Sequence, residues 1–221
     1  MENYIPGLLD KEEIEDAVKE DLADALEHGI LVSNLAVMLA RELGESEKFV
    51  TEIAIAGMLH DIGKLKLSKY LYGRNKSTLK IEEMKYVRMH STFSCDILRD
   101  KGYDDFVLQS VYHHHENYDG SGYPDNIKGD MIPWPARIIR ACDVYAALVS
   151  DRPYRAAFDM DTAIELMIDE VKNFDMRVFL AFQRVIHSEN FKDIKEMVDV
   201  ANHVRKEGLR MFEAKIEGGV V

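Results

Sequence analysis

Residues 60–64 read His-Asp-Ile-Gly-Lys, and residues 114–124 read His-His-Glu-Asn-Tyr-Asp-Gly-Ser-Gly-Tyr-Pro. In both stretches, two adjacent residues of types that bind metal ions are followed within a few positions by glycine. Further candidate ligands stand apart in the sequence, at His28, His90 and Asp143. Because the candidates are spread over more than 100 residues, the fold and not a local loop must gather them. We therefore expect a metal centre built by tertiary packing, with a chemistry in which metal ions assist the attack of water.

Apolar residues recur at helical spacing through most of the chain, and no alternating strand pattern is found. Residues 116–133 are rich in glycine and proline and are expected to form a loop. Ser46 is suited to cap a helix. The fold class is therefore all-α, a single-domain helical bundle whose metal ligands project inward from several helices. The expected helices lie at about 11–27, 28–43, 46–60, 81–99, 104–115, 135–149, 160–173, 175–187 and 190–213.

The bulk composition is that of a globular protein of 221 residues, with 47% hydrophobic and 31% charged residues. No apolar run reaches the roughly 20 residues that cross a bilayer, and residues 1–4 do not begin a signal segment. These features predict a cytoplasmic protein without a membrane partner. Cys95 and Cys142 lie in apolar helical surroundings, so we expect two reduced core thiols.

The net charge of −12 argues against binding of duplex nucleic acid, which depends on neutralising phosphates. It is compatible with a small anionic substrate, because two or three divalent ions invert the local field.

The adjacent pairs His60-Asp61 and His114-His115 favour a polynuclear centre. Neighbouring side chains on a helix diverge by about 100°, so such a pair flanks one ion or serves two. With no thiolate nearby, iron and manganese are favoured, and zinc, nickel or magnesium are alternatives. A single histidine is more often a structural, hydrogen-bonded residue, and that interpretation holds for the remaining ones, His113, His187 and His203.

Lys64 lies one helical turn beyond His60. It is either an exposed surface lysine or a cation that stabilises the scissile phosphate.

The two opening stretches together resemble the HD-GYP family. These are all-helical, metal-dependent phosphodiesterases of the HD superfamily that hydrolyse cyclic di-GMP. The resemblance covers roughly residues 20–185. The His-Asp pair is shared by many phosphohydrolases, whereas the longer stretch is specific. The resemblance implies an N-terminal extension at residues 1–20 and an HD-GYP-like catalytic domain at residues 21–221.

The resemblance also implies roles for individual residues. The implied ligands of two or three divalent ions are His28, His60, Asp61, His90, His114, His115 and Asp143, with Asp24, where a glutamate is more usual, on a third ion. Asp61 and Lys64 are the implied catalytic residues, and the implied substrate-binding residues are Gly122, Tyr123, Pro124, Arg152 and Arg155. For the two arginines the alternative is a polar turn balanced by Asp151 and Asp159. The chain departs from the family at Asn117, where arginine is frequent, at Ala146, where aspartate is usual, and at residues 91–94.

The expected function is hydrolysis of cyclic di-GMP to linear pGpG, and either pGpG or GMP is the final product. One alternative is a phosphohydrolase of another cyclic dinucleotide or nucleotide, and another is a receptor that binds cyclic di-GMP without cleaving it. Regulation is expected to come from a homodimer, a partner protein, or the metal and redox state.

Overall fold

The structure is a computed structural model that describes residues 11–71, 87–151 and 155–194, together with 196, 198 and 202; the side chains of residues 11–24 and 68–71 are not described. Within this part of the chain the architecture is all-α, without a β-strand, which confirms the predicted fold class. The α-helices are α1 (Lys11–Glu42), α2 (Glu47–Leu59), α3 (Lys64–Leu71), α5 (His90–Asp100), α6 (Asp105–Tyr112), α7 (Trp134–Val149), α8 (Met160–Asp169) and α9 (Met176–Ile186). Three short 3₁₀ helices, η1 (Gly129–Met131), η2 (Val171–Asn173) and η3 (Glu189–Phe191), lie between or after them.

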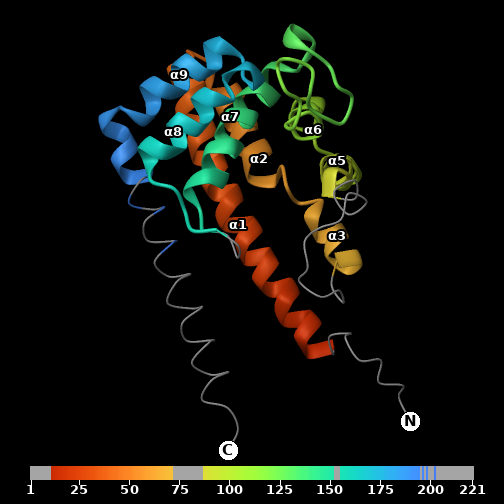
Figure 1. Ribbon diagram of the computed structural model, residues 1–221. Helices are drawn as coiled ribbons and strands as arrows, with labels where there is room; N and C mark the ends of the chain where they lie inside the picture. Colours follow the sequence, from red (N-terminus) through yellow and green to blue (C-terminus); the bar gives the residue numbers. More distant parts are fainter. Residues whose placement is uncertain are drawn as a thin grey trace, which may run out of the picture.

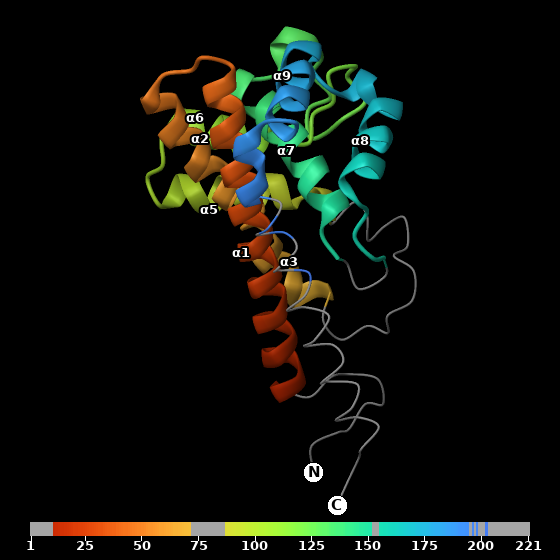
Figure 2. The same cartoon turned by 90° about the vertical axis from the view of Figure 1, so that its left-hand side faces the viewer.

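Helix α1 is the longest of the described helices, and α2 and α7 pack against its C-terminal half (Figures 1 and 2). The sequence predicted two segments, 11–27 and 28–43, but the structure has one continuous helix. Gly29 lies inside it where α2 approaches most closely: a Cβ at Gly29 would overlap the carbonyl oxygen of Met58. The glycine therefore marks a close helix crossing and not a break, and this crossing brings His28 beside the end of α2.

Helix α2 begins as predicted and ends before the His60-Asp61 pair. The Ser46 hydroxyl accepts a hydrogen bond from the Phe49 amide, at 3.3 Å, and so caps the helix. The helix ends at Leu59, and residues 60–63 form a turn. Helix α3 follows and was not among the predicted helices.

The second adjacent pair also lies just beyond a helix. Helix α6 starts at its N-cap Asp104 and ends at Tyr112, which is three residues earlier than predicted. Residues 113–133 then form the expected loop, which contains η1. Farther along the chain, the predicted helix 160–173 is α8 followed by η2. Most of the predicted helix 190–213, and the start of the predicted helix 81–99, lie outside the described residues.

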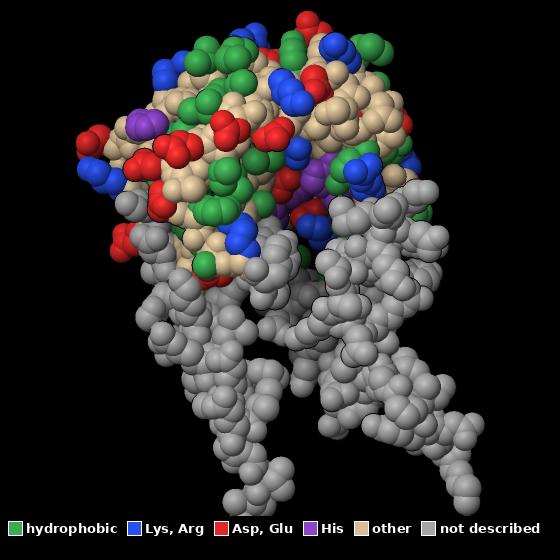
Figure 3. Space-filling view, in the orientation of Figure 1, with side chains coloured by type: hydrophobic (Ala, Val, Ile, Leu, Met, Phe, Trp, Pro, Cys, Tyr) green, Lys and Arg blue, Asp and Glu red, His purple; other side chains and the backbone are tan. Residues whose placement is uncertain are grey.

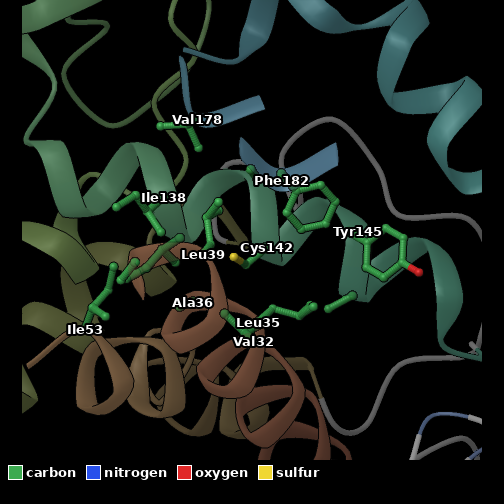
Figure 4. Packing of buried hydrophobic residues seen from close by; sticks show 14 of the residues in the cluster. Val32, Leu35, Ala36, Leu39, Ile53, Ile138, Cys142, Tyr145, Val178 and Phe182 are labelled. Atoms are coloured by element: carbon green, nitrogen blue, oxygen red, sulfur yellow. The ribbon is translucent and has the colours of Figure 1, made fainter. Parts of the chain in front are cut away.

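The core is formed mainly by α1, α2, α7 and α9 (Figure 4). Leu35 and Leu39 of α1 face Cys142 of α7 and Phe182 of α9, and all four side chains are fully buried. Cys95 and Cys142 are both buried and unbonded to each other, as predicted for core thiols. No helix in the described part of the chain is long and apolar enough to span a membrane. Packing in this core holds α1 and α7 in contact although they are far apart in the sequence, and this contact positions the site described below.

Candidate metal centre

Seven of the predicted ligands converge in the structure as two adjoining groups. The first group is Asp61, His90, His114 and His115, and the second group is His28, His60 and Asp143. Within each group the candidate ligand atoms all lie within 4.8 Å of one another. All seven side chains are buried except that of His115, which is half-buried. Histidine side chains are visible in a hollow of the face shown in Figure 3, beside acidic and basic side chains.

The second group joins three helices. His28 comes from α1, His60 follows α2, and Asp143 lies in α7. The Asp143 Oδ1 atom is 2.9 Å from the Nε2 atom of His28 and 3.6 Å from that of His60. These three side chains meet because α1 packs against both α2 and α7.

The first group is gathered from the turn after α2, the start of α5 and the turn after α6. The His90 Nε2 atom lies 3.3 Å from His114 Nε2 and 2.9 Å from His115 Nε2. It also lies 3.2 Å from the Oδ1 atom of Asp61. The backbone amide of Gly63 donates to the Ser94 hydroxyl at 2.8 Å, which ties the turn after α2 to α5.

Asp61 stands between the two groups. Its Oδ1 atom faces His90, whereas its Oδ2 atom lies 3.4 Å from His60 Nε2 and 3.9 Å from His28 Nε2. The adjacent residues His60 and Asp61 therefore belong to different groups, whereas His114 and His115 belong to the same one. A carboxylate in this position is suited to bridge two ions.

Three imidazoles are oriented by the backbone. The Nδ1 atoms of His60, His90 and His114 lie 2.7, 2.5 and 2.6 Å from the carbonyl oxygens three residues earlier. With Nδ1–H donating to the carbonyl, each Nε2 presents its lone pair to the centre, which is the tautomer that a metal-ligating histidine needs.

Buried polar atoms in the centre lack hydrogen-bond partners. The Nε2 atom of His60 and the Oδ1 atom of Asp61 are fully buried and make no hydrogen bond within the described part of the chain. Leaving such atoms unsatisfied is costly, and a divalent cation would satisfy both. The donor set and its geometry thus fit a metal centre.

The charge states of the centre also suit metal ions. Burial opposes ionisation of Asp61, but Lys64 and the nearby imidazoles hold its pKa well below the usual value. Burial likewise opposes ionisation of Asp143, yet the hydrogen bond with His28 and the nearby imidazoles of His60 and His115 hold its pKa well below the usual value. Both carboxylates are therefore charged at neutral pH.

Most of the imidazoles are held neutral. Burial, reinforced by neighbouring imidazoles, lowers the pKa of His114 well below its usual value and that of His115 to about 3. Burial also lowers the pKa values of His28 and His90. His60 differs: burial lowers its pKa, but Asp61 and Asp143 outweigh burial and raise it. Anionic carboxylates and neutral imidazoles are the forms that ligate metals.

The rim of the centre carries the other implied residues. The Lys64 ammonium pairs with Asp61 Oδ2, and its side chain is 43% exposed, so it reaches both the centre and solvent. The Tyr123 ring stacks on His115 with ring centroids 4.7 Å apart. At Gly122 a Cβ would overlap the backbone of His115 and Asn117, so this loop lies tightly against the first group. Pro124 follows Tyr123 through a cis peptide bond.

Arg155 is placed differently from the prediction of substrate contact. Its guanidinium donates to the carbonyl oxygens of Ala147 at 2.7 Å and Leu148 at 3.1 Å, at the end of α7. It also lies over the Phe158 ring, 4.3 Å from the centroid. These contacts favour the structural alternative for Arg155. Arg152 and the side chain of Asp24 lie outside what the structure describes; the backbone of Asp24 is part of α1.

Two residues of this region were not predicted as site residues. Arg140 lies in α7, three residues before Asp143, and its guanidinium donates to the side-chain oxygen of Asn117. Glu116 is buried and accepts a hydrogen bond from the Asp125 amide at 2.7 Å, which anchors the loop. For Arg140 the available signal was its position one helical turn before Asp143, on the same side of α7.

Comparisons with known proteins agree with this architecture. A family model for the HD domain matches residues 12–178, and the chain belongs to the HD domain family. This confirms the family resemblance predicted from the sequence.

Among curated relatives, a cyclic di-GMP phosphodiesterase of Pseudomonas aeruginosa is 35% identical over 160 residues, which are 72% of this chain and 38% of the relative. A 3′3′-cGAMP-specific phosphodiesterase of Vibrio cholerae is 34% identical over 157 residues, which are 69% of this chain and 36% of that relative. The chain spans less than half the length of these relatives.

Two solved structures share the fold. An HD-GYP-type protein of Bdellovibrio bacteriovorus aligns with a TM-score of 0.59 at 19% identity, over 80% of this chain and 62% of the other. The HD domain of a phosphodiesterase from L. monocytogenes, solved with cyclic-di-AMP, aligns with a TM-score of 0.54 at 15% identity, over 86% of this chain and 96% of the other.

Proposed function

We propose that this chain is a metal-dependent phosphodiesterase that hydrolyses cyclic di-GMP to linear pGpG and further to GMP. The observation that carries the proposal is the position of Asp61, whose two oxygens face two adjoining groups of buried ligands. Such a paired centre is suited to phosphodiester cleavage. The phosphodiesterases named among the relatives support the same reaction class.

The proposed cofactors are two divalent ions, iron or manganese, with one ion in each group. The ligands are nitrogen and oxygen atoms, and the two buried thiols belong to neither group, which suits these metals. Asp24 is the proposed ligand of a weaker third ion, because its backbone lies one helical turn before His28 on α1.

Ions held there would supply an activated water and offset the negative charge on the phosphate. The protein contributes orientation: backbone carbonyls fix the rings of His60, His90 and His114, and Asp61 and Asp143 supply the negative charge that holds the ions. Lys64 pairs with Asp61 and still reaches solvent, so its ammonium is placed to hydrogen-bond a bound phosphate oxygen and to stabilise the developing charge. Tyr123, Gly122 and Pro124 form a rim against which the substrate packs.

A second candidate substrate is another cyclic dinucleotide. The relative specific for 3′3′-cGAMP and the fold neighbour solved with cyclic-di-AMP favour this alternative. A non-hydrolysing receptor is a further alternative, but a receptor has no chemical need of an intact, oriented ligand set. We further propose that the protein acts in the cytoplasm and is regulated through a homodimer or a partner protein.

The proposal is tested by measuring metal content per chain after anaerobic purification, together with turnover of a panel of cyclic dinucleotides. We expect about two ions per chain and the fastest turnover with cyclic di-GMP. Faster turnover of cGAMP or cyclic di-AMP would assign the alternative substrate. Tight binding of cyclic di-GMP by metal-loaded protein without turnover would assign the receptor function and overturn the enzymatic one.

A further inference from the structure

Arg140 places a positive charge at the wall of the metal centre. It lies three residues before Asp143 on α7, so both side chains leave the same side of the helix. Its guanidinium bonds to Asn117, which lies two residues after the candidate ligand His115. The guanidinium therefore lies between the helix that carries Asp143 and the loop that follows His114 and His115.

A chain of hydrogen bonds fixes the Arg140 side chain. The Asn117 Oδ1 atom accepts from Arg140 Nε at 3.1 Å and from Nη2 at 2.9 Å. The Asn117 amide nitrogen donates to the Ser121 hydroxyl at 2.9 Å, and that hydroxyl donates to Asp119 at 2.6 Å. Because the Ser121 proton is committed to Asp119, the Asn117 nitrogen must face Ser121 and its oxygen must face Arg140.

The partner of Arg140 is neutral. Within the described residues no carboxylate oxygen lies within 4.0 Å of its nitrogens, and Asn117 is its hydrogen-bond partner. Arg137, one turn earlier on the same helix, is paired with two carboxylates, Asp130 at 2.6 Å and Asp175 at 3.0 Å. The charge of Arg137 is thus paired directly with carboxylates, whereas Asp143 and Glu170 act on Arg140 only from beyond 4.0 Å, so its charge is held in place and left available to an anion.

The unused donors of Arg140 suit a phosphate. A guanidinium has five N–H groups, and Asn117 accepts from two of them. The edge formed by Nη1 and Nη2 keeps donors for a bidentate contact, which is the geometry in which arginine binds phosphate oxygens.

We propose that Arg140 is a substrate-binding residue that donates hydrogen bonds to the phosphate held at the metal centre, the one that is cleaved. Asn117 is a positioning residue that orients the guanidinium without neutralising it. This inference rests on the proposed phosphodiesterase function and adds to it a cation that was not among the predicted site residues.

Two variants test the role of Arg140. Arg140→Ala removes the cation. Asn117→Asp keeps the size of the partner and its acceptor contacts with Arg140, gives up the donation to Ser121, and supplies a carboxylate that neutralises the guanidinium; it serves if Arg140→Ala fails to fold. The control is Arg99→Ala, which removes an exposed arginine paired with Asp96 on α5. Each metal-loaded protein is assayed for kcat/KM with cyclic di-GMP and with bis(4-nitrophenyl) phosphate, and for metal content and melting temperature.

We expect kcat/KM to fall by roughly 10-fold to 100-fold for both substrates in both variants, the loss that follows from removing a hydrogen bond to a charged group. Metal content should not change, both variants should remain folded at the assay temperature, and Arg99→Ala should match the wild type. The small diester has one phosphate and no base. A loss confined to cyclic di-GMP would therefore overturn the proposal, because it would place Arg140 at a base or at the second phosphate.

Unchanged kinetics in Asn117→Asp, with Arg140→Ala affected only in melting temperature, would overturn the proposal in favour of a structural role. If the wild type cleaves the small diester but no cyclic dinucleotide, the proposed substrate class fails while the small diester still tests Arg140. A wild type that is inactive on both substrates with metals bound would overturn both proposals.

Discussion

The Nε2 atom of His28 lies 2.9 Å from the Oδ1 atom of Asp143, although the two residues are 115 positions apart in the sequence. His28 belongs to α1 and Asp143 to α7, so this pair exists because the two helices pack together. Both residues belong to the second ligand group, and that group is therefore an outcome of the helix core. Mutations that loosen the contact between α1 and α7 should release metal before they abolish helicity.

The first prediction concerns the carboxylate between the groups. Asp61→Asn keeps the shape of the side chain but removes its charge, and an amide is a poor ligand. Removing a residue that only hydrogen-bonds to a metal ligand lowers metal affinity or activity by about 10-fold to 100-fold. Asp61 is itself a proposed ligand, so we expect loss of metal from both groups and a fall in turnover of at least about 100-fold. Metal content is measured per chain by mass spectrometry. The matched control is Asp96→Asn, an exposed aspartate on α5.

Asp143→Asn separates the two groups in the same experiment. It should lose the ion of the second group and retain much of the other. Asp24→Ala should lose at most one ion and keep part of the activity. Full metal occupancy in Asp61→Asn would place Asp61 outside the ligand set.

The second prediction separates rate from affinity at Lys64. Its ammonium pairs with Asp61 at the rim of the centre, where it is suited to stabilise charge that develops in the transition state. Lys64→Ala should therefore lower kcat by roughly 100-fold and change KM less. Lys66→Ala is the control, because Lys66 is an exposed lysine two residues away whose ammonium lies over the Phe93 ring. Weakened substrate binding with an unchanged rate would make Lys64 an anchor for the anion.

The third prediction separates Arg152 from Arg155. Arg155 caps the end of α7 through backbone carbonyls, so Arg155→Ala should destabilise the protein by about 1–2 kcal/mol and leave KM nearly unchanged. Arg152→Ala should raise KM for the dinucleotide, whose second phosphate needs a cation, and should leave cleavage of bis(4-nitrophenyl) phosphate unchanged. Chemical denaturation and steady-state kinetics measure the two effects. A raised KM with unchanged stability in Arg155→Ala would restore the predicted substrate contact.

The fourth prediction concerns the pH dependence of the metal-free protein. Burial lowers the pKa of His115 from 6.5 to about 3 in the folded state. His115 therefore binds a proton near pH 6.5 in the unfolded chain but only near pH 3 in the folded chain. Its contribution to the free energy of unfolding is complete above pH 6.5 and is lost as the pH falls toward 3. At pH 5 the loss is about 2 kcal/mol. His28, His90 and His114 act in the same direction, and the raised pKa of His60 acts in the opposite one.

The measurement is urea denaturation of the chelated full chain between pH 7 and pH 5. His115→Gln should flatten the dependence, and His187→Gln, on an exposed side chain, should leave it unchanged. Equal slopes in the wild type and His115→Gln would show that His115 is not held neutral in the folded protein.

Local features of the sequence determined the helical class and the chemistry of the ligands. Apolar periodicity is a property of each segment alone, so most helices were predicted close to their observed bounds. The helix cap at Ser46 and the loop at residues 116–133 are also predicted by local preferences of single residues, namely serine at helix starts and glycine and proline in loops. The division of α1 between residues 27 and 28 was wrong, because the helix is continuous there. Gly29 serves a contact with α2, and local rules do not include such contacts.

The types of ligand were likewise predictable from the sequence, because the donor atoms of imidazole and carboxylate groups do not depend on where the residue lies in the fold. The sequence could not say that His60 and Asp61 serve different groups, that Arg155 is engaged by the end of α7, or that Arg140 is held by a neutral amide. Each of these depends on distances between residues far apart in the chain. Those distances are set by helix packing, so the tertiary structure alone decided which ligands meet and which positive charge remains available to a substrate.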